Sequence, residues 1–233
     1  MWFEHLEEGA SWAELWREYI RCGHCVAIRR VEGLCPCCGA RIEQLEPNAG
    51  QLANGSDVPV RHTFLGGEGR YEDWVYLAML EHEWKRPITD KDRFLEIAPG
   101  SRPSARLTLV VVFWSYFETK IDRLFREGLS DKIPAPVMED LLQRYSGIGA
   151  RLDRLYRIAF SATYWSDLEG LGFPQVSRIL QRVHEKRNLF AHGHPEAIDD
   201  QLIVELVDTL RDEHEAWIAV FNKRATRCNA NTS

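Results

Sequence analysis

The chain has 233 residues, of which 45% are hydrophobic and 27% are charged, and these are the proportions of a folded protein rather than a disordered one. This length is enough for one medium domain with a small appendage, or for two small domains. No run of about 18 apolar residues occurs, so we expect no membrane span. The formal net charge of −6 argues against extensive wrapping of nucleic acid, but it allows a local basic site.

The N-terminal sequence MWFEHLEEGASW is acidic and lacks the basic and apolar regions of a secretory signal. We therefore expect a cytoplasmic protein whose cysteines are reduced. Residues 3–20 have the apolar spacing of a short amphipathic helix.

Two C-x-x-C pairs follow this segment, CGHC at 22–25 and CPCC at 35–38. Four thiolates at this spacing match the tetrahedral ligation of Zn²⁺, so we expect Cys22, Cys25, Cys35 and Cys38 to hold one ion. The arm between the pairs has a β-rich composition, and the segment resembles a zinc ribbon, whose second half usually reads CPxCG and here reads CPCCG. Since four protein ligands leave no position for water, the Zn²⁺ is expected to be structural.

Disulfide bonds and a thioredoxin-like redox pair are the alternatives for these cysteines. The lack of a secretory signal argues against disulfides, and no βαβ pattern surrounds either pair. Cys37 is an alternative to Cys38 as a ligand, and His24 is an alternative to a thiolate, but the spacing favours the four cysteines named above.

The rest of the chain predicts a mainly α fold with three regions. Residues 1–50 hold the N-terminal helix and the zinc ribbon, and residues 51–102 are a linker with one helix at about 71–84, between stretches rich in Pro, Asn and Gly. Residues 103–228 form a helical domain, with helices expected at 105–127, 136–145, 149–160, 174–191 and 199–226. The first of these is apolar nearly all round, which is typical of a central, buried helix.

A polar residue interrupts the apolar stripe of the helix expected at 174–191. The stripe consists of Val176, Ile179, Leu180 and Val183. One turn later the same face carries Arg187, and a buried arginine is costly unless it has a partner. His192 lies at the expected end of the helix, just before Gly193, which is expected to form a left-handed cap.

The segment RNLFAHG, from Arg187 to Gly193, resembles the R-x4-6-H motif of the HEPN superfamily, which lies near the end of a helix and begins with arginine and a polar residue. The segment YFETKIDRL at 116–124 looks like the long helix that precedes the motif in this family, and the resemblance covers about residues 103–226. The bare spacing is weakly specific because Arg178 and His184 also satisfy it. The Arg-Asn start and the Ala-His-Gly end favour Arg187 and His192.

This resemblance implies a helical bundle that forms a homodimer and places the motifs of both protomers in one cleft. In catalytic members of the family this cleft is a metal-independent endoribonuclease, so RNA is the expected substrate and no cofactor is expected for cleavage. His192 would act as general base on the ribose 2′-OH or as acid on the leaving 5′-oxygen, and Arg187 would stabilise the phosphate. Asn188 would orient the phosphate or the histidine, and Glu118 would pair with Arg187 and fix its rotamer. The expected products carry 2′,3′-cyclic phosphate and 5′-hydroxyl ends.

The resemblance places such an enzyme among toxins and anti-phage defence effectors, with an antitoxin or a sensor protein as a further partner. HEPN toxins silenced by a nucleotidyltransferase often carry a tyrosine two residues after the motif histidine, and here that position is His194, which argues against control of that kind. Arg178, Arg182 and Lys186 share one helix face, which is either a solvated surface or a track for an RNA backbone.

Two other functions remain open. In the first, the HEPN bundle is inactive and serves as a nucleotide-binding or dimerisation module, with Arg187 in a buried ion pair with Glu118 or Asp122 and His192 capping helix carbonyls. In the second, the zinc ribbon leads a nucleic-acid-binding regulator. The intact set of Arg187, Asn188 and His192 favours the enzyme, and the small number of basic residues in the ribbon disfavours the regulator. His184 is expected to be structural.

Overall fold

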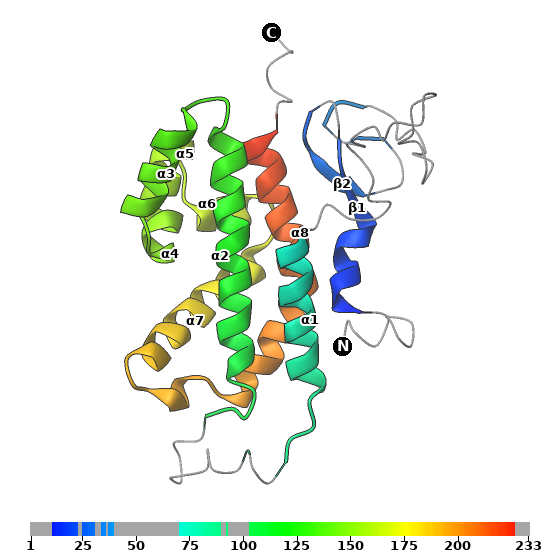
Figure 1. Cartoon of the computed structure of the whole chain (residues 1–233), viewed down its shortest axis with the longest axis vertical. Helices are drawn as coiled ribbons and strands as arrows, with labels where there is room; N and C mark the ends of the chain where they lie inside the picture. The colour runs from blue at the N-terminus through cyan, green and yellow to red at the C-terminus, as the bar shows by residue number, and fades with distance from the viewer. Residues whose placement is uncertain are drawn as a thin grey trace, which may run out of the picture.

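A computed structural model describes residues 11–22, 25–30, 34–35, 37–39, 70–89, 92 and 103–226, and this part of the chain is mainly helical (Figure 1). The long helices are α1 (Tyr71–Lys85), α2 (Thr108–Leu129), α7 (Pro174–Ala191) and α8 (Asp200–Ala225). The shorter helices are η2 (Trp12–Glu18), α3 (Ala135–Arg144), α4 (Ile148–Ala150), η4 (Arg151–Leu155), α5 (Tyr156–Phe160), α6 (Tyr164–Gly170) and η5 (Pro195–Ala197). Two short strands, β1 (Tyr19–Arg21) and β2 (Ile28–Arg30), form an antiparallel pair.

The predicted mainly α fold is confirmed, and most predicted helices lie within a few residues of the observed ones. The helix predicted at 149–160 is α4, η4 and α5 in one continuous run, with a π-helical turn in its middle. Sequence periodicity missed α6, a two-turn helix that Thr163 and Ser166 cap reciprocally. The expected helix at 3–20 is described only from residue 11, and it ends at Glu18 because Tyr19 already pairs with Arg30 as a strand.

Helix α2 is the centre of the bundle: α1 and α8 pack along it, and α7 contacts both α2 and α8 (Figure 1). Its apolar side chains are buried almost all round the helix, among them Leu109, Val110, Phe113, Trp114 and Phe117. The prediction of a central, buried helix is therefore confirmed. Within the described ranges, no helix is both long enough and apolar enough to cross a membrane.

Two buried cations of α2 join it to its neighbours. Lys120 donates a hydrogen bond to Glu213 of α8, and Arg123 Nη2 donates to Asp73 Oδ2 of α1 at 2.7 Å. All four side chains are at most 5% exposed, so each charge depends on its partner. Helix α1 therefore packs as a member of the bundle, although the sequence on either side of it has the composition of a linker.

The N-terminal unit, which consists of η2, β1, β2 and the cysteine pairs, packs on α1, α2 and α8. Trp16 is fully buried, and its indole Nε1 donates to Tyr116 Oη of α2 at 3.1 Å. The Asn222 side chain of α8 holds β2 at both polar groups of Ile28, because it accepts from the Ile28 amide at 2.8 Å and donates to the Ile28 carbonyl at 2.6 Å. The cysteine-rich segment is thus fixed to α8 through the backbone of β2.

We predict that His214 makes the fold sensitive to mild acid. The ring of His214 is buried, edge-on to Trp16 at 4.3 Å, and burial lowers its pKa well below 6.5, with the charges of Lys120 and Arg211 acting in the same direction. The unfolded chain therefore binds a proton that the folded chain excludes, and stability is lost as the pH falls below about 6.5, by up to about 1.4 kcal/mol per pH unit for one such histidine.

His214→Phe should flatten this dependence in urea unfolding between pH 7.5 and 5. Burial and the charge of Arg187 lower the pKa of His184 as well, so part of the acid sensitivity should persist in the variant. A wild type whose stability does not change over this range would contradict the account.

Candidate functional site

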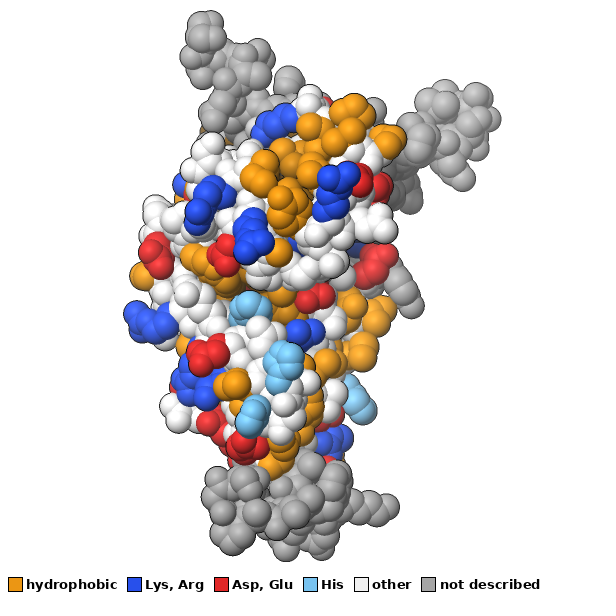
Figure 2. Space-filling model, turned by 90° about the vertical axis from the view of Figure 1, so that its left-hand side faces the viewer, with side chains coloured by type: hydrophobic (Ala, Val, Ile, Leu, Met, Phe, Trp, Pro, Cys, Tyr) orange, Lys and Arg blue, Asp and Glu red, His pale blue; other side chains and the backbone are white. Residues whose placement is uncertain are grey.

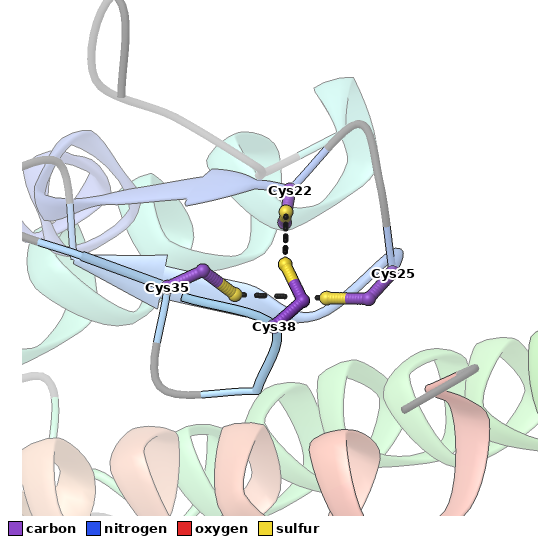
Figure 3. A group of neighbouring side chains, drawn as sticks. All are labelled: Cys22, Cys25, Cys35 and Cys38. Atoms are coloured by element: carbon purple, nitrogen blue, oxygen red, sulfur yellow. Dashed lines mark hydrogen bonds between the residues drawn. The ribbon is translucent and has the colours of Figure 1, made fainter. Parts of the chain in front are cut away.

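The four predicted cysteine ligands converge on one point (Figure 3). Cys22 Sγ lies 3.6 Å from Cys38 Sγ, Cys25 Sγ lies 3.6 Å from Cys35 Sγ, and all four sulfurs are within 4.8 Å of one another. A tetrahedral ion with metal–sulfur bonds of about 2.3 Å separates its sulfur ligands by about 3.8 Å. A disulfide would join two sulfurs at about 2.05 Å, so these thiols are unbridged and could hold a metal ion.

The structure also settles which cysteines belong to the cluster. Cys38, not Cys37, supplies the fourth sulfur, as the C-x-x-C spacing predicts. His24, the alternative ligand, lies outside the described residues. Burial raises the pKa of the Cys25 thiol, and hydrogen bonds with the neighbouring thiols act in the same direction. A bound cation would supply the positive charge that stabilises thiolates at this buried site.

The same two backbone features accompany both cysteine pairs. The Val26 amide donates to the Cys22 carbonyl at 2.9 Å, and the Gly39 amide donates to the Cys35 carbonyl at 2.8 Å. Each turn ends in the left-handed region, with φ of +65° at Val26 and +70° at Gly39. Glycine adopts this conformation freely, whereas a β-branched residue is strained in it. Val26 therefore keeps a strained backbone conformation, which is imposed by the turn that brings Cys22 and Cys25 together.

The Arg187–His192 motif lies at the opposite side of the bundle from β1 and β2, at the C-terminal end of α7 (Figure 1). The helix ends at Ala191, and the His192 amide closes it by donating to the Asn188 and Leu189 carbonyls, both at 3.1 Å. Gly193 follows with φ of +92°, which confirms the predicted left-handed cap. The His192 side chain is exposed, and histidines gather on the lower half of this face (Figure 2).

Arg187 and Asn188 form a contact beside this histidine. Arg187 Nη1 donates to Asn188 Oδ1 at 3.3 Å, and both side chains are partly exposed. Arg187 is therefore partly buried, and not fully buried as its place in the apolar stripe of α7 led us to expect. A cation, an amide and an imidazole are available together at one helix end.

Glu118 does not join this group. Among the described contacts, Arg187 forms an ion pair with neither Glu118 nor Asp122, and Asp122 binds Arg126 and Arg151 instead. Glu118 lines a separate hollow of about 460 Å³ between α1 and α2. The reason lies in how α7 crosses α2: His184 stacks on Trp114, and α7 then runs toward the end of the bundle where α2 begins, which takes Arg187 away from Glu118 (Figure 1).

A second hollow, of about 540 Å³, lies along α7 and was not expected from the sequence. Five residues of α7 line one wall: Arg178, Gln181, Arg182, His184 and Glu185. Gly149, Asp153 and Trp165 face them from α4, η4 and α6. The helical spacing of the α7 residues is visible in the sequence, but the facing wall comes from tertiary packing that no local pattern indicates.

His184 forms part of this hollow rather than part of the core. Its ring lies parallel to that of Trp114, with centroids 5.1 Å apart and planes 3° apart. Burial lowers the pKa of His184, the charge of Arg187 lowers it further, and Asp153 opposes them. The imidazole is therefore neutral at pH 7 and can donate one hydrogen bond and accept another.

Comparisons of the chain with protein-family models, with curated proteins and with solved structures found no match.

We predict that glycine gives a more stable protein than alanine does at positions 26 and 39. In regular helices and strands the preference is the opposite. Alanine at position 26 keeps the strain of the left-handed conformation, whereas glycine removes it, so Val26→Gly should be more stable than Val26→Ala by about 1 kcal/mol in urea unfolding. Gly39→Ala should cost about the same, because a methyl group there meets nothing within 4 Å and only the backbone is affected. Equal stability of the two position-26 variants would show that the turn is unstrained.

Proposed function

We propose that this protein is a metal-independent endoribonuclease of HEPN type that acts as a homodimer. The observation that carries the proposal is the group at the end of α7, where the Arg187 guanidinium contacts the Asn188 amide and the exposed His192 follows Asn188 by four residues. These are the residue types that cleavage by the ribose 2′-OH requires: an imidazole that can accept or donate a proton, and a fixed cation for the phosphate.

In the proposed reaction His192 takes the proton of the 2′-OH, whose oxygen attacks the adjacent phosphorus. The bond from phosphorus to the 5′-oxygen breaks, and that oxygen leaves with a proton from a second imidazole. Arg187 binds the phosphate and stabilises the charge that builds up on it, and Asn188 holds Arg187 in position through their hydrogen bond. One ribose is left with a 2′,3′-cyclic phosphate and the next with a 5′-hydroxyl.

The need for a second imidazole is the reason for proposing a dimer. A symmetric dimer through the end of α7 would bring two copies of His192 to one phosphate, one as base and one as acid. Leu189, 37% exposed on the last turn of α7, gives this end an apolar contact for a second copy. A toxin or defence role, an antitoxin or sensor partner and a cytoplasmic location are parts of the same proposal and rest on the family resemblance.

The proposal is tested by cleavage of total RNA in EDTA by the wild type, His192→Ala and Arg187→Ala. Each substitution should lower the cleavage rate at least about 100-fold, since each removes a group that acts on the reacting atoms. His194→Ala is the matched control, because His194 is an exposed histidine two residues away that contacts Glu196, and it should retain activity. RNA that is bound but never cleaved would favour an inactive nucleotide-binding module, and cleavage that survives His192→Ala would contradict the mechanism.

We infer that the metal of the cysteine cluster is Zn²⁺ and that the N-terminal unit is a zinc ribbon with a structural role. All four ligands are thiols, the sulfur separations fit a tetrahedral ion, and no ligand position is left for water. The ribbon would then fold the segment that packs on α8, while cleavage takes place at the other side of the bundle.

Zinc content should therefore be one ion per chain, measured by elemental analysis of the purified protein. Cys38→Ser should lose the ion and lower the melting temperature, because thiolate ligation contributes directly to folding. Cys37→Ser, which removes a cysteine outside the cluster, should retain the ion. Removing the zinc should lower the melting temperature, while the rate of RNA cleavage per folded molecule should stay unchanged. A zinc-free protein that is folded but inactive would contradict the structural role.

A further inference from the structure

The hollow along α7 lies on the same helix as the proposed catalytic group. Arg178, Glu185 and His192 follow one another at intervals of seven residues, so they lie on one face of α7, and Glu185 and His192 are separated by about 10 Å along the axis. A single extended ligand could therefore occupy the hollow and reach His192.

The walls of the hollow include two rings, the indole of Trp165 and the imidazole of His184. Trp165 is partly exposed, and its Nε1 donates to Asp153 Oδ1 at 3.1 Å, which fixes the orientation of the indole. On the other side His184 lies between Trp114 and Gly149. A methyl group at Gly149 would come within 3.2 Å of His184 Cε1, so the glycine is what allows the imidazole to lie there.

The polar groups of the hollow are two cations, two carboxylates (Asp153 and Glu185) and neutral hydrogen-bonding groups. Arg178 and Arg182 supply positive charge, and each is only partly engaged, by Gln175 and by Glu205. Gln181, Glu185 and the neutral His184 supply donors and acceptors, and within the described part of the chain no hydrogen bond to the His184 ring occurs. Ring surfaces, hydrogen-bonding groups and cations together suit a nucleotide better than a bare anion or an apolar molecule.

We propose that this hollow binds one nucleotide of the RNA strand, with its base stacked on Trp165 beside the edge of the His184 ring and its phosphate at Arg178 and Arg182. This inference rests on the proposed ribonuclease function and adds the substrate-binding site to it. The nucleotide would lie about two helical turns from His192, so it selects and aligns the strand without contacting the reacting phosphate. His184 then acts in substrate binding and not in proton transfer.

The test is the binding of a fluorescein-labelled eight-nucleotide single-stranded RNA in EDTA, followed by fluorescence anisotropy. The His192→Ala protein serves as the parent, so that binding is measured without cleavage. Adding Trp165→Ala should weaken binding about tenfold, the usual effect of losing a base-stacking ring. Adding Gly149→Ala should weaken it severalfold, because the methyl group displaces His184.

Gly147→Ala is the matched control. It lies two residues away, a methyl group there meets nothing within 4 Å, and its φ of −78° suits alanine, so binding should not change. Gly149→Ala should fold at least as well as its parent in a thermal melt, since alanine favours α4 more than glycine does.

Each outcome separates the two proposals. Weakened binding with Trp165→Ala and Gly149→Ala, but not with Gly147→Ala, supports the nucleotide site whether or not the wild type cleaves RNA. Unchanged binding in all three variants overturns the site, and the cleavage proposal survives if the wild type is active. A parent protein that does not bind the RNA overturns the site as well, and a wild type that also fails to cleave RNA overturns the ribonuclease.

Discussion

Lys120 and Arg123, the two cations buried in α2, determine how the rest of the bundle is assembled. A buried charge without a partner destabilises a protein by several kcal/mol, and these two find their carboxylates on other helices, Glu213 of α8 and Asp73 of α1. The aromatic rings of the core add to the restraint, since the Arg123 guanidinium lies 5.9 Å from the ring centroids of both Trp16 and Trp217. Helices α1 and α8 and the N-terminal turn must therefore dock on α2 in one arrangement.

This arrangement separates the four-cysteine cluster from the motif on α7. Asn222 of α8 holds β2 on one side of the bundle, while α7 packs against α2 and α8 and its C-terminal end lies on the other side (Figure 1). A metal held by Cys22, Cys25, Cys35 and Cys38 would therefore stabilise the N-terminal unit without reaching His192. On the α7 side, the structure leaves exposed a helix end with three polar groups and, next to it, a hollow with ring and cationic walls.

The local features of this structure could be predicted from the sequence, and the features that depend on packing could not. Helical periodicity indicated α2, α7 and α8, and thiol spacing indicated the four cysteines, because both are repeats within a short segment. Tyr19 was misassigned to a helix because its strand partner Arg30 lies beyond the cysteine turn. The partial exposure of Arg187 and the separation of Glu118 from it depend on where α7 crosses α2, which the stacking of His184 on Trp114 fixes. The contribution of Trp165 to the hollow along α7 could not be predicted for the same reason.

The chemistry of the product ends distinguishes the proposed attack by the ribose 2′-OH, with His192 and Arg187 as catalytic residues, from other routes of RNA cleavage. A defined RNA should be incubated with the wild type in EDTA, and both new ends should be identified by mass spectrometry. The account predicts a 2′,3′-cyclic phosphate on one fragment and a 5′-hydroxyl on the other, with neither formed by His192→Ala. Fragments that carry a 5′-phosphate and a 3′-hydroxyl would contradict it, because in that reaction the 2′-OH is not the nucleophile.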